Sequence, residues 1–342
     1  MIHSRRRMQP RVTVVVRSFN RLAALCELVE ALLAQDHDSF EIVVVEQSEV
    51  RPADAAARLA ELARDPRVRV VRSAPLGGAG ARNLGVEHAR GEIVVCIDDD
   101  DLPVGADFLR AIEVPFEDPR CLGVICRYVW GEREDISGAY RAVATSRCMR
   151  FSPVLRLPRT YPRYDAPVPR VDYVHGSGGA YRRAVFARFG LWDTDTPIED
   201  ETSLGIRIGR GLAPGEYLCF DPRPRLRRRL DVDGGLAKRE AGAPSFFARF
   251  MRFVHAILGR YYPRRVRLLY PAYAFFGLIW TFAWIWADSR AHRTFAHRLG
   301  SSALFLVSWP VLAAWALRVP FGRPDDAATV ALAPRSALAP DS

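Results

Sequence analysis

The chain has 342 residues, 49% hydrophobic and 26% charged, so it can form one large α/β domain with an appendage and is not a disordered tail. The net charge of +10 is compatible with nucleic-acid binding, but the arginines cluster near C-terminal apolar stretches, where an anionic lipid surface explains them better, and we expect no nucleic-acid partner. The six cysteines show no CxxC pair or zinc-finger spacing, which indicates neither disulfides nor structural zinc.

The basic N-terminus, residues 1–9, runs directly into a strand pattern. It lacks the apolar stretch and small-residue cleavage site of a secretory signal. We therefore expect the part of the chain that follows this N-terminus to stay in the cytoplasm.

Strand and helix patterns then alternate with short connections. Short β-branched runs predict buried strands, and apolar residues at helical spacing predict helices. In chain order the strands are expected at 12–16, 40–45, 68–71 and 93–97, and the helices at 22–34, 53–63 and 81–88, the last led by the glycines of 77–80. Such alternation predicts a parallel sheet covered by helices on both faces, with ligands bound beyond the carboxyl ends of the strands.

The pattern weakens over residues 120–170, which are rich in Pro and Arg. This stretch is interpreted as a variable segment, a candidate substrate loop. Order returns at 171–188, and a helix is predicted at 200–209.

The C-terminal part changes composition. Apolar residues between Phe246 and Leu258 fall on one side of a helical wheel and basic residues on the other, which predicts an amphipathic helix on a membrane surface. Two apolar stretches, 268–287 and 299–317, have about the ~20 residues that a bilayer crossing needs. Basic residues outside both stretches favour cytoplasmic termini. The alternative is a hydrophobic hairpin that packs inside a soluble domain or lies in the interface.

These patterns divide the chain into four parts. They are a catalytic domain (1–240), an amphipathic juxtamembrane helix (241–265), a two-helix membrane hairpin (266–322) and a disordered tail (323–342).

Four adjacent aspartates, Asp98 to Asp101, follow the apolar strand at 93–97. Adjacent carboxylates repel one another, so the arrangement is costly unless something positive binds there. Their hard oxygens suit Mg²⁺ or Mn²⁺. In an extended segment alternate side chains share a side, so Asp98 and Asp100 can converge while Asp99 points away. A solvated acidic turn or helix cap is the alternative, which the position directly after a buried strand disfavours.

Several further motifs follow in order: the strand and turn at 12–21, the segment 35–48, the run 80–85, the run 89–92 before the aspartates, and the segment from Gly178 through Trp192 and Asp193 to Glu199, Asp200 and Glu201. Over roughly residues 11–230 this order resembles the family 2 glycosyltransferases, which have the GT-A fold. The resemblance implies a three-layer α/β/α nucleotide-sugar transferase domain.

The resemblance also implies roles for single residues. Asp98 or Asp99 would touch the ribose, and Asp100, with help from Asp98, would hold Mn²⁺ or Mg²⁺ against the diphosphate. Asp200 would be the catalytic base, although an acidic pair at a helix start is also ordinary capping. The other residues implied to contact the nucleotide-sugar are Arg17, Ser18, Asn20, Glu46, Gln47, Arg82 and Glu199.

The chain departs from the family's pattern at two places. Glu46 and Gln47 stand where many relatives have paired aspartates at the uracil, so a UDP-sugar is the first expectation, with dTDP- and GDP-sugars as alternatives. The arginine-rich run 223–229 stands where many relatives have a His after the final strand. An Arg of this run could hold the diphosphate, or the run could face anionic lipid.

The function expected from these residues is metal-dependent, inverting transfer of a sugar to an acceptor hydroxyl of a glycan or lipid-linked acceptor, at the bacterial inner membrane. A polyprenyl-phosphate sugar synthase is a rival, but Leu102 and Pro103 replace the usual Leu-Gln after the aspartates. A nucleotidyltransferase is disfavoured because no Gly-rich basic signature follows the first strand. A non-catalytic membrane scaffold is disfavoured because the acidic residues are intact.

Overall fold

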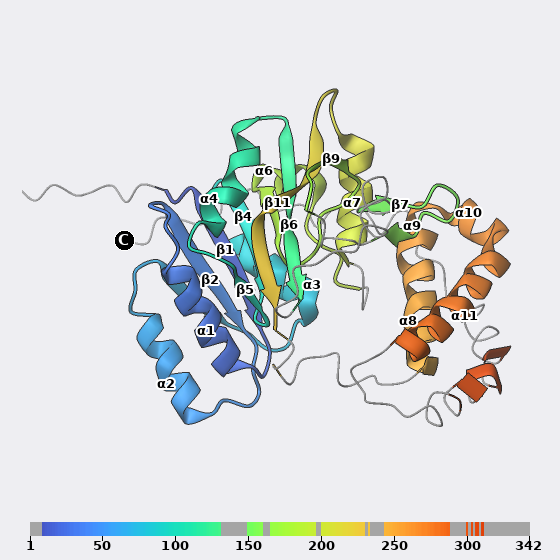
Figure 1. Cartoon of the computed structure of the whole chain (residues 1–342), viewed down its shortest axis with the longest axis horizontal. Helices are drawn as coiled ribbons and strands as arrows, with labels where there is room; N and C mark the ends of the chain where they lie inside the picture. The colour runs from blue at the N-terminus through green and yellow to red at the C-terminus, as the bar shows by residue number, and fades with distance from the viewer. Residues whose placement is uncertain are drawn as a thin grey trace, which may run out of the picture.

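The computed structural model describes residues 9–130, 149–159, 165–195, 200–229, 232, 243–287 and parts of 299–310 (Figure 1). The strands of this part of the chain are β1 (Val12–Ser18), β2 (Phe40–Glu46), β3 (Val68–Arg72), β4 (Ile93–Asp98), β5 (Asp101–Pro103), β6 (Cys121–Trp130), β7 (Arg150–Phe151), β8 (Pro158–Arg159), β9 (Val168–Val171), β10 (Gly179–Arg182) and β11 (Tyr217–Arg228). The helices are α1 (Leu22–Leu33), α2 (Ala53–Leu62), α3 (Gly77–His88), α4 (Phe108–Glu113), η1 (Val114–Glu117), α6 (Ala184–Phe189), α7 (Asp200–Gly211), α8 (Ala243–Phe253), η3 (Val254–Leu258), α9 (Gly259–Tyr261), α10 (Pro263–Leu268) and α11 (Tyr270–Ala287).

The central sheet of the described residues has the strand order β3-β2-β1-β4-β10-β6-β11-β5, with β9 also paired to β11. The first four strands are parallel, as the alternating pattern predicts. β10 is antiparallel to both of its neighbours, and β5 and β9 are antiparallel to β11. The prediction of a parallel sheet therefore holds for the N-terminal half of a mixed sheet.

Both faces of the sheet are buried because alternate side chains point to opposite sides. On β1, Val14 and Val16 pack into a cluster with residues of α1 and α4, whereas Val15 packs into a second cluster with Trp192 and Leu204. Helices cover the sheet accordingly (Figure 1). The predicted three-layer α/β/α arrangement is present in the described chain.

The predicted elements of the N-terminal part are confirmed with small shifts at their ends. Helix α3 begins at Gly77, so the glycine run forms the first turn of the helix instead of leading into it. The interpretation of 120–170 as a variable segment and candidate substrate loop is wrong for 121–130, which form the central strand β6, and the short strands β7 and β8 also lie in this range. Residues 131–148 and 160–164 lie outside the described part.

The amphipathic segment forms α8, η3 and α9, but its apolar side is covered by protein. Phe253, Val254 and Ile257 are buried in the same core cluster as Tyr173, which precedes β10 of the central sheet. Phe247 of α8 packs against Phe305. The prediction that this apolar side lies on a membrane surface is therefore wrong.

The predicted two-helix membrane hairpin receives no support from the structure. Within the ranges described above, no helix has both the length and the apolar character needed to cross a membrane. Helix α11 occupies most of the first predicted stretch, and residues 311–317 of the second lie outside the described chain, as does the predicted tail.

Candidate active site

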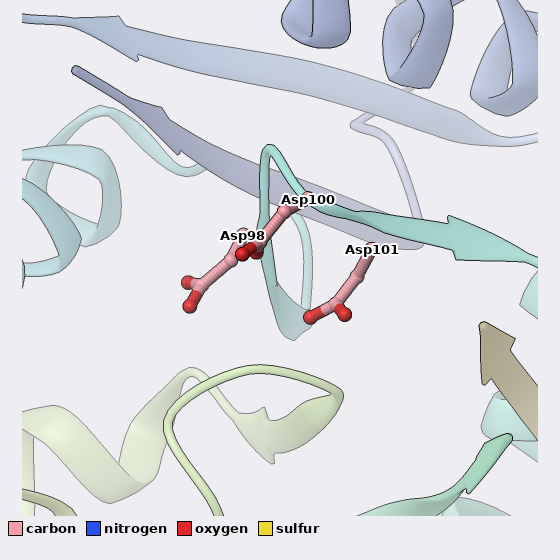
Figure 2. A group of neighbouring side chains, drawn as sticks. All are labelled: Asp98, Asp100 and Asp101. Atoms are coloured by element: carbon pink, nitrogen blue, oxygen red, sulfur yellow. The ribbon is translucent and has the colours of Figure 1, made fainter. Parts of the chain in front are cut away.

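The aspartate run lies where the parallel strands end. β4 ends at Asp98, which is the register partner of Arg17 on β1, and the chain turns before entering β5 at Asp101. Figure 2 shows Asp98, Asp100 and Asp101 beside this turn. One oxygen from each of the three lies within 4.8 Å of the others. Asp99 is not part of this group, as the alternation predicts.

Asp98 is held by Arg17 through two hydrogen bonds. Arg17 Nε donates to Oδ1 at 2.6 Å and Nη2 to Oδ2 at 2.7 Å. Burial alone would raise the pKa of Asp98, but the charges of Arg17, Arg82 and Arg228 hold that pKa well below its usual range. Asp98 is therefore ionised throughout the physiological pH range.

Asp99 points to the turn after β1. Its carboxylate accepts hydrogen bonds from Ser18 Oγ at 2.7 Å and from Arg21 Nη1 at 3.0 Å. Burial raises the pKa of Asp99 to about 6, against the opposing effects of Arg21 and Ser18. Asp98 or Asp99 is expected to contact the ribose. In the structure, the carboxylate of Asp99 binds the turn after β1.

Asp101 is fully buried and has the densest set of partners in the run. Arg228 Nε lies 2.6 Å from its Oδ1, and Ser177 Oγ donates to Oδ2 at 2.6 Å. Tyr128 Oη donates to the same oxygen at 3.4 Å. Burial raises the pKa of Asp101 to about 7, although Arg228 opposes the shift. The sequence pattern assigns Asp101 no separate role, because its partners come from strands and loops far along the chain.

Arg228 belongs to the arginine-rich run 223–229, and its side chain contacts the aspartates. The run lies largely within β11, not after the final strand, and Arg228 faces the aspartates. Arg223 pairs instead with Asp221 and Arg229 with Glu27. Only some of these arginines therefore approach the candidate site.

Asp100 best fits a metal ligand. Its Oδ2 contacts Arg21 Nη1 at 3.1 Å and Arg228 Nη1 at 3.3 Å. Its Oδ1 is buried and has no hydrogen-bond partner among the described residues. Mg²⁺ and Mn²⁺ take oxygen ligands, and Mg²⁺ is usually bound through one or two carboxylates plus substrate phosphates. The donor set of Asp100 with Asp98 and Asp101 therefore fits such an ion.

Arg82 reaches the same region from α3. It is 5% exposed, and its guanidinium lies 5.6 Å from the ring centroid of Trp192. Trp192 is tied to α3 because its backbone N–H donates to Asn83 Oδ1 at 3.0 Å. A Cβ on Gly176 would lie 2.6 Å from Arg82 Nη2, so this glycine makes room for the guanidinium.

Three of the residues predicted to contact the nucleotide-sugar, Asn20, Glu46 and Gln47, lie at or just after the ends of β1 and β2. Glu46 is buried, and its carboxylate accepts a hydrogen bond from Ser48 N at 2.5 Å. Gln47 Oε1 accepts one from Leu76 N at 2.7 Å. Asn20, at a φ of 58°, accepts from Glu49 N at 2.9 Å. The structure thus places all three beside one another at the strand ends, where their oxygens hold loops.

The acidic pair before α7 is only partly described. Helix α7 begins at Asp200, whose side chain lies outside the described residues together with Glu199. The next residue, Glu201, is buried, with Oε1 3.8 Å from His175 Nε2. Burial lowers the pKa of His175 to about 4, so it is neutral at pH 7. Neither His175 nor Ser177 is predicted from the sequence, although both stand just before the glycine pair of 178–179.

Comparisons with known proteins bear on the family and the fold. A family model described as Glycosyl transferase family 2 matches residues 13–190. The succinoglycan biosynthesis protein ExoO of Rhizobium meliloti (strain 1021) is 38% identical over 228 residues, which are 62% of this chain and 59% of that protein. The chain thus matches less than two thirds of the length of this relative.

Two solved structures have a similar fold. The mannosyltransferase PcManGT from Pyrobaculum calidifontis, in complex with GDP-Man and Mn²⁺, has a TM-score of 0.54 at 21% identity, over 90% of this chain and 85% of that one. GalNAc-T7 with UDP, GalNAc and Mn²⁺ has a TM-score of 0.55 at 16% identity, over 72% and 48%. The mixed sheet is therefore that of GT-A glycosyltransferases. With more than half of its length matched by the family model, the chain belongs to glycosyltransferase family 2.

Proposed function

We propose that this chain transfers a sugar, with inversion, from a nucleotide-diphosphate sugar to a hydroxyl of a glycan or lipid-linked acceptor in polysaccharide or glycolipid synthesis. The proposal depends on one observation. At the carboxyl ends of the central strands, the carboxylates of Asp98 and Asp100 lie beside the guanidiniums of Arg17 and Arg228. Carboxylates suit a divalent ion, and guanidiniums suit the diphosphate oxygens.

Asp100, with Asp98, would hold Mn²⁺ or Mg²⁺, because Oδ1 of Asp100 is buried without a partner in the described chain. When bound, the ion supplies Lewis-acid stabilisation of the charge that develops on the departing diphosphate. Arg228 lies within 3.3 Å of Asp100 and is placed to pair with the same phosphate oxygens.

Asp200 would take the proton from the acceptor hydroxyl. Its position at the first residue of α7 supports this role, since a helix N-terminus stabilises an ionised carboxylate. An ionised carboxylate can act as a general base at neutral pH. Direct attack of the hydroxyl on the anomeric carbon would then invert its configuration.

The donor is proposed to be a UDP-sugar, with dTDP- and GDP-sugars as alternatives, and the site of action the cytoplasmic face of the bacterial inner membrane. Exposed apolar side chains in the C-terminal helices support the membrane location. Leu268 is 80% exposed, Phe275 59% and Ile279 52%. Such side chains suit contact with lipid.

A thermal-shift panel of UDP, dTDP and GDP, each with and without Mn²⁺, tests the proposal. One nucleotide should raise the melting temperature in a metal-dependent way, because a ligand at about 100 times its Kd stabilises the folded state by about 2.7 kcal/mol. Asp100→Asn should lose the metal-dependent part of the shift. Stabilisation by none of the three would contradict the proposed donor class.

A further inference from the structure

A second pocket lies away from the aspartates. It is about 270 Å³ in volume and is bounded by β7, the end of β9, the C-terminal half of α7, the start of β11 and Tyr262. β11 lines this pocket at Leu218 and reaches Asp101 only at Arg228, ten residues later. At about 3.3 Å per residue, the strand carries the chain about 30 Å between the two sites.

The pocket is strongly basic. Four arginines line it, Arg150, Arg156, Arg170 and Arg210, together with two carboxylates. Both carboxylates are already paired, Asp172 with Arg150 at 3.1 Å and Glu216 with Arg188 at 2.7 Å. No carboxylate of the described chain pairs with Arg156, Arg170 or Arg210. Three positive charges therefore remain available to an anion.

Aromatic rings orient two of these arginines without neutralising them. The guanidiniums of Arg156 and Arg210 lie 5.5 and 5.1 Å from the ring centroid of Tyr262. Arg156 also lies 5.2 Å from the ring centroid of Phe151. Stacking on an aromatic face keeps the planar fork of an Arg ready for bidentate binding of phosphate oxygens. The Nε of Arg156 is buried and has no acceptor within the described residues.

Arg156 occupies a backbone conformation that residues other than glycine rarely adopt, with a φ of 55°. The turn is fixed on both sides: Arg156 N donates to Ser152 O at 3.0 Å, and Leu157 N donates to Ser152 Oγ at 2.9 Å. A hydrogen-bonded turn thus supplies Arg156 to the lining of the pocket.

Apolar side chains flank the basic pocket. The same turn carries Val154, which is 63% exposed, and Arg265 Nη1 donates to the Val154 carbonyl at 2.8 Å. Leu268, 80% exposed, stands one helical turn after Arg265 on α10. A basic pocket beside exposed apolar side chains fits an anionic group that carries an apolar tail.

We propose that this pocket binds the phosphate headgroup of an anionic lipid and anchors the enzyme at a membrane surface. Arg156, Arg170 and Arg210 contact the phosphate oxygens, while Val154 and Leu268 contact the adjoining acyl region. The site is separate from the aspartate site, and it does not depend on which sugar is transferred.

Flotation of the full-length protein with phosphatidylcholine vesicles, with and without phosphatidylglycerol, tests the proposal at physiological salt. The wild type should float only with the anionic vesicles. Arg156→Gln combined with Arg210→Gln should weaken binding about 30-fold, at about fivefold for each basic residue near an anionic surface. The matched control, Arg58→Gln on α2 with Arg64→Gln in the turn after it, removes the same charge elsewhere on the chain and should bind as the wild type does.

A second variant and a test with inorganic phosphate complete the experiment. Arg170→Gln, an exposed residue, gives a second variant if the double variant is unstable, and it should bind about fivefold more weakly. Equal losses in the pocket and control variants would overturn the proposal, because they would show general charge attraction. If the wild type did not float with anionic vesicles, yet inorganic phosphate raised its melting temperature and Arg156→Gln with Arg210→Gln removed that shift, the lipid source would be overturned and a free-phosphate site identified.

Discussion

Arg228 and Asp101 are register partners in the antiparallel pair of β11 and β5, and their side chains form an ion pair with 2.6 Å between Nε and Oδ1. The carboxylate is fully buried, so its ionised form depends on the guanidinium. This pair joins the last strand of the sheet to the aspartate run.

Arg228→Ala should destabilise the fold by about 3 kcal/mol, because removing one partner of a buried pair leaves an uncompensated charge. Urea denaturation followed by circular dichroism measures the change. The double variant Arg228→Ala with Asp101→Asn should recover part of the loss. Equal stability of the single and double variants would show that the buried charge is not the cause.

Asp100→Asn should lower the Mn²⁺-dependent transfer rate by about 10²-fold or more, because a bound ion contributes several kcal/mol of charge stabilisation. Calorimetric titration of Mn²⁺ in the presence of the nucleotide diphosphate should show the matching loss of affinity. Asp99→Asn is the comparison, since Asp99 faces Ser18 and Arg21 instead. A smaller metal effect at Asp100 than at Asp99 would remove Asp100 from the proposed role.

Asp200→Asn should lower kcat by 10² to 10⁴, roughly the range for loss of a general base, while nucleotide binding survives. Steady-state kinetics with the identified donor and calorimetry with the nucleotide diphosphate separate the two effects. Glu201→Gln, one position further along α7, tests whether the neighbouring carboxylate acts as the general base instead. Retention by Asp200→Asn of more than about a tenth of the activity would exclude it as the base.

The lowered pKa of Glu41 makes the free energy of unfolding depend on pH. Burial opposes ionisation of Glu41, but Arg90 and Thr13 bind the carboxylate, with Arg90 N donating at 2.7 Å, and lower its pKa below 4.5. A lowered folded pKa means that this stabilisation is present above pH 4.5 and is lost as pH falls through the folded value. Glu41→Gln should therefore cost about 2 kcal/mol at pH 7 and less below about pH 4. Denaturation at several pH values measures the convergence, and a pH-independent difference would contradict it.

Gly85→Ala should destabilise the fold by about 1 to 3 kcal/mol, because a Cβ there would lie 2.2 Å from Val15 Cγ1 on β1. Gly209→Ala is the matched control on α7, where a Cβ meets nothing within 4 Å. That variant should be neutral or stabilising by about 1 kcal/mol, since alanine favours helices. Thermal unfolding of both variants measures the difference in stability. Equal melting temperatures would show that α3 moves far enough from β1 to accommodate the added Cβ.

The sequence by itself determined the four parallel strands, the helices between them and the position of the aspartates at a strand end. These features depend on local periodicity, because a β-branched run such as that of β1 is buried on both faces wherever it is paired. The separation of Asp99 from Asp98 and Asp100 agrees with the alternation expected from the sequence, but residues 99 and 100 form a turn, and Asp101 also joins the group.

Only the tertiary structure decided which partners the aspartates have and what covers the C-terminal apolar side chains. Arg228 meets Asp101 across 127 positions of the chain, a contact that no local pattern encodes. The apolar side of the segment from α8 to α9 has the same periodicity whether lipid or protein covers it. Its burial against the catalytic domain, with Phe253 and Ile257 in the core, depends on the three-dimensional packing of distant elements.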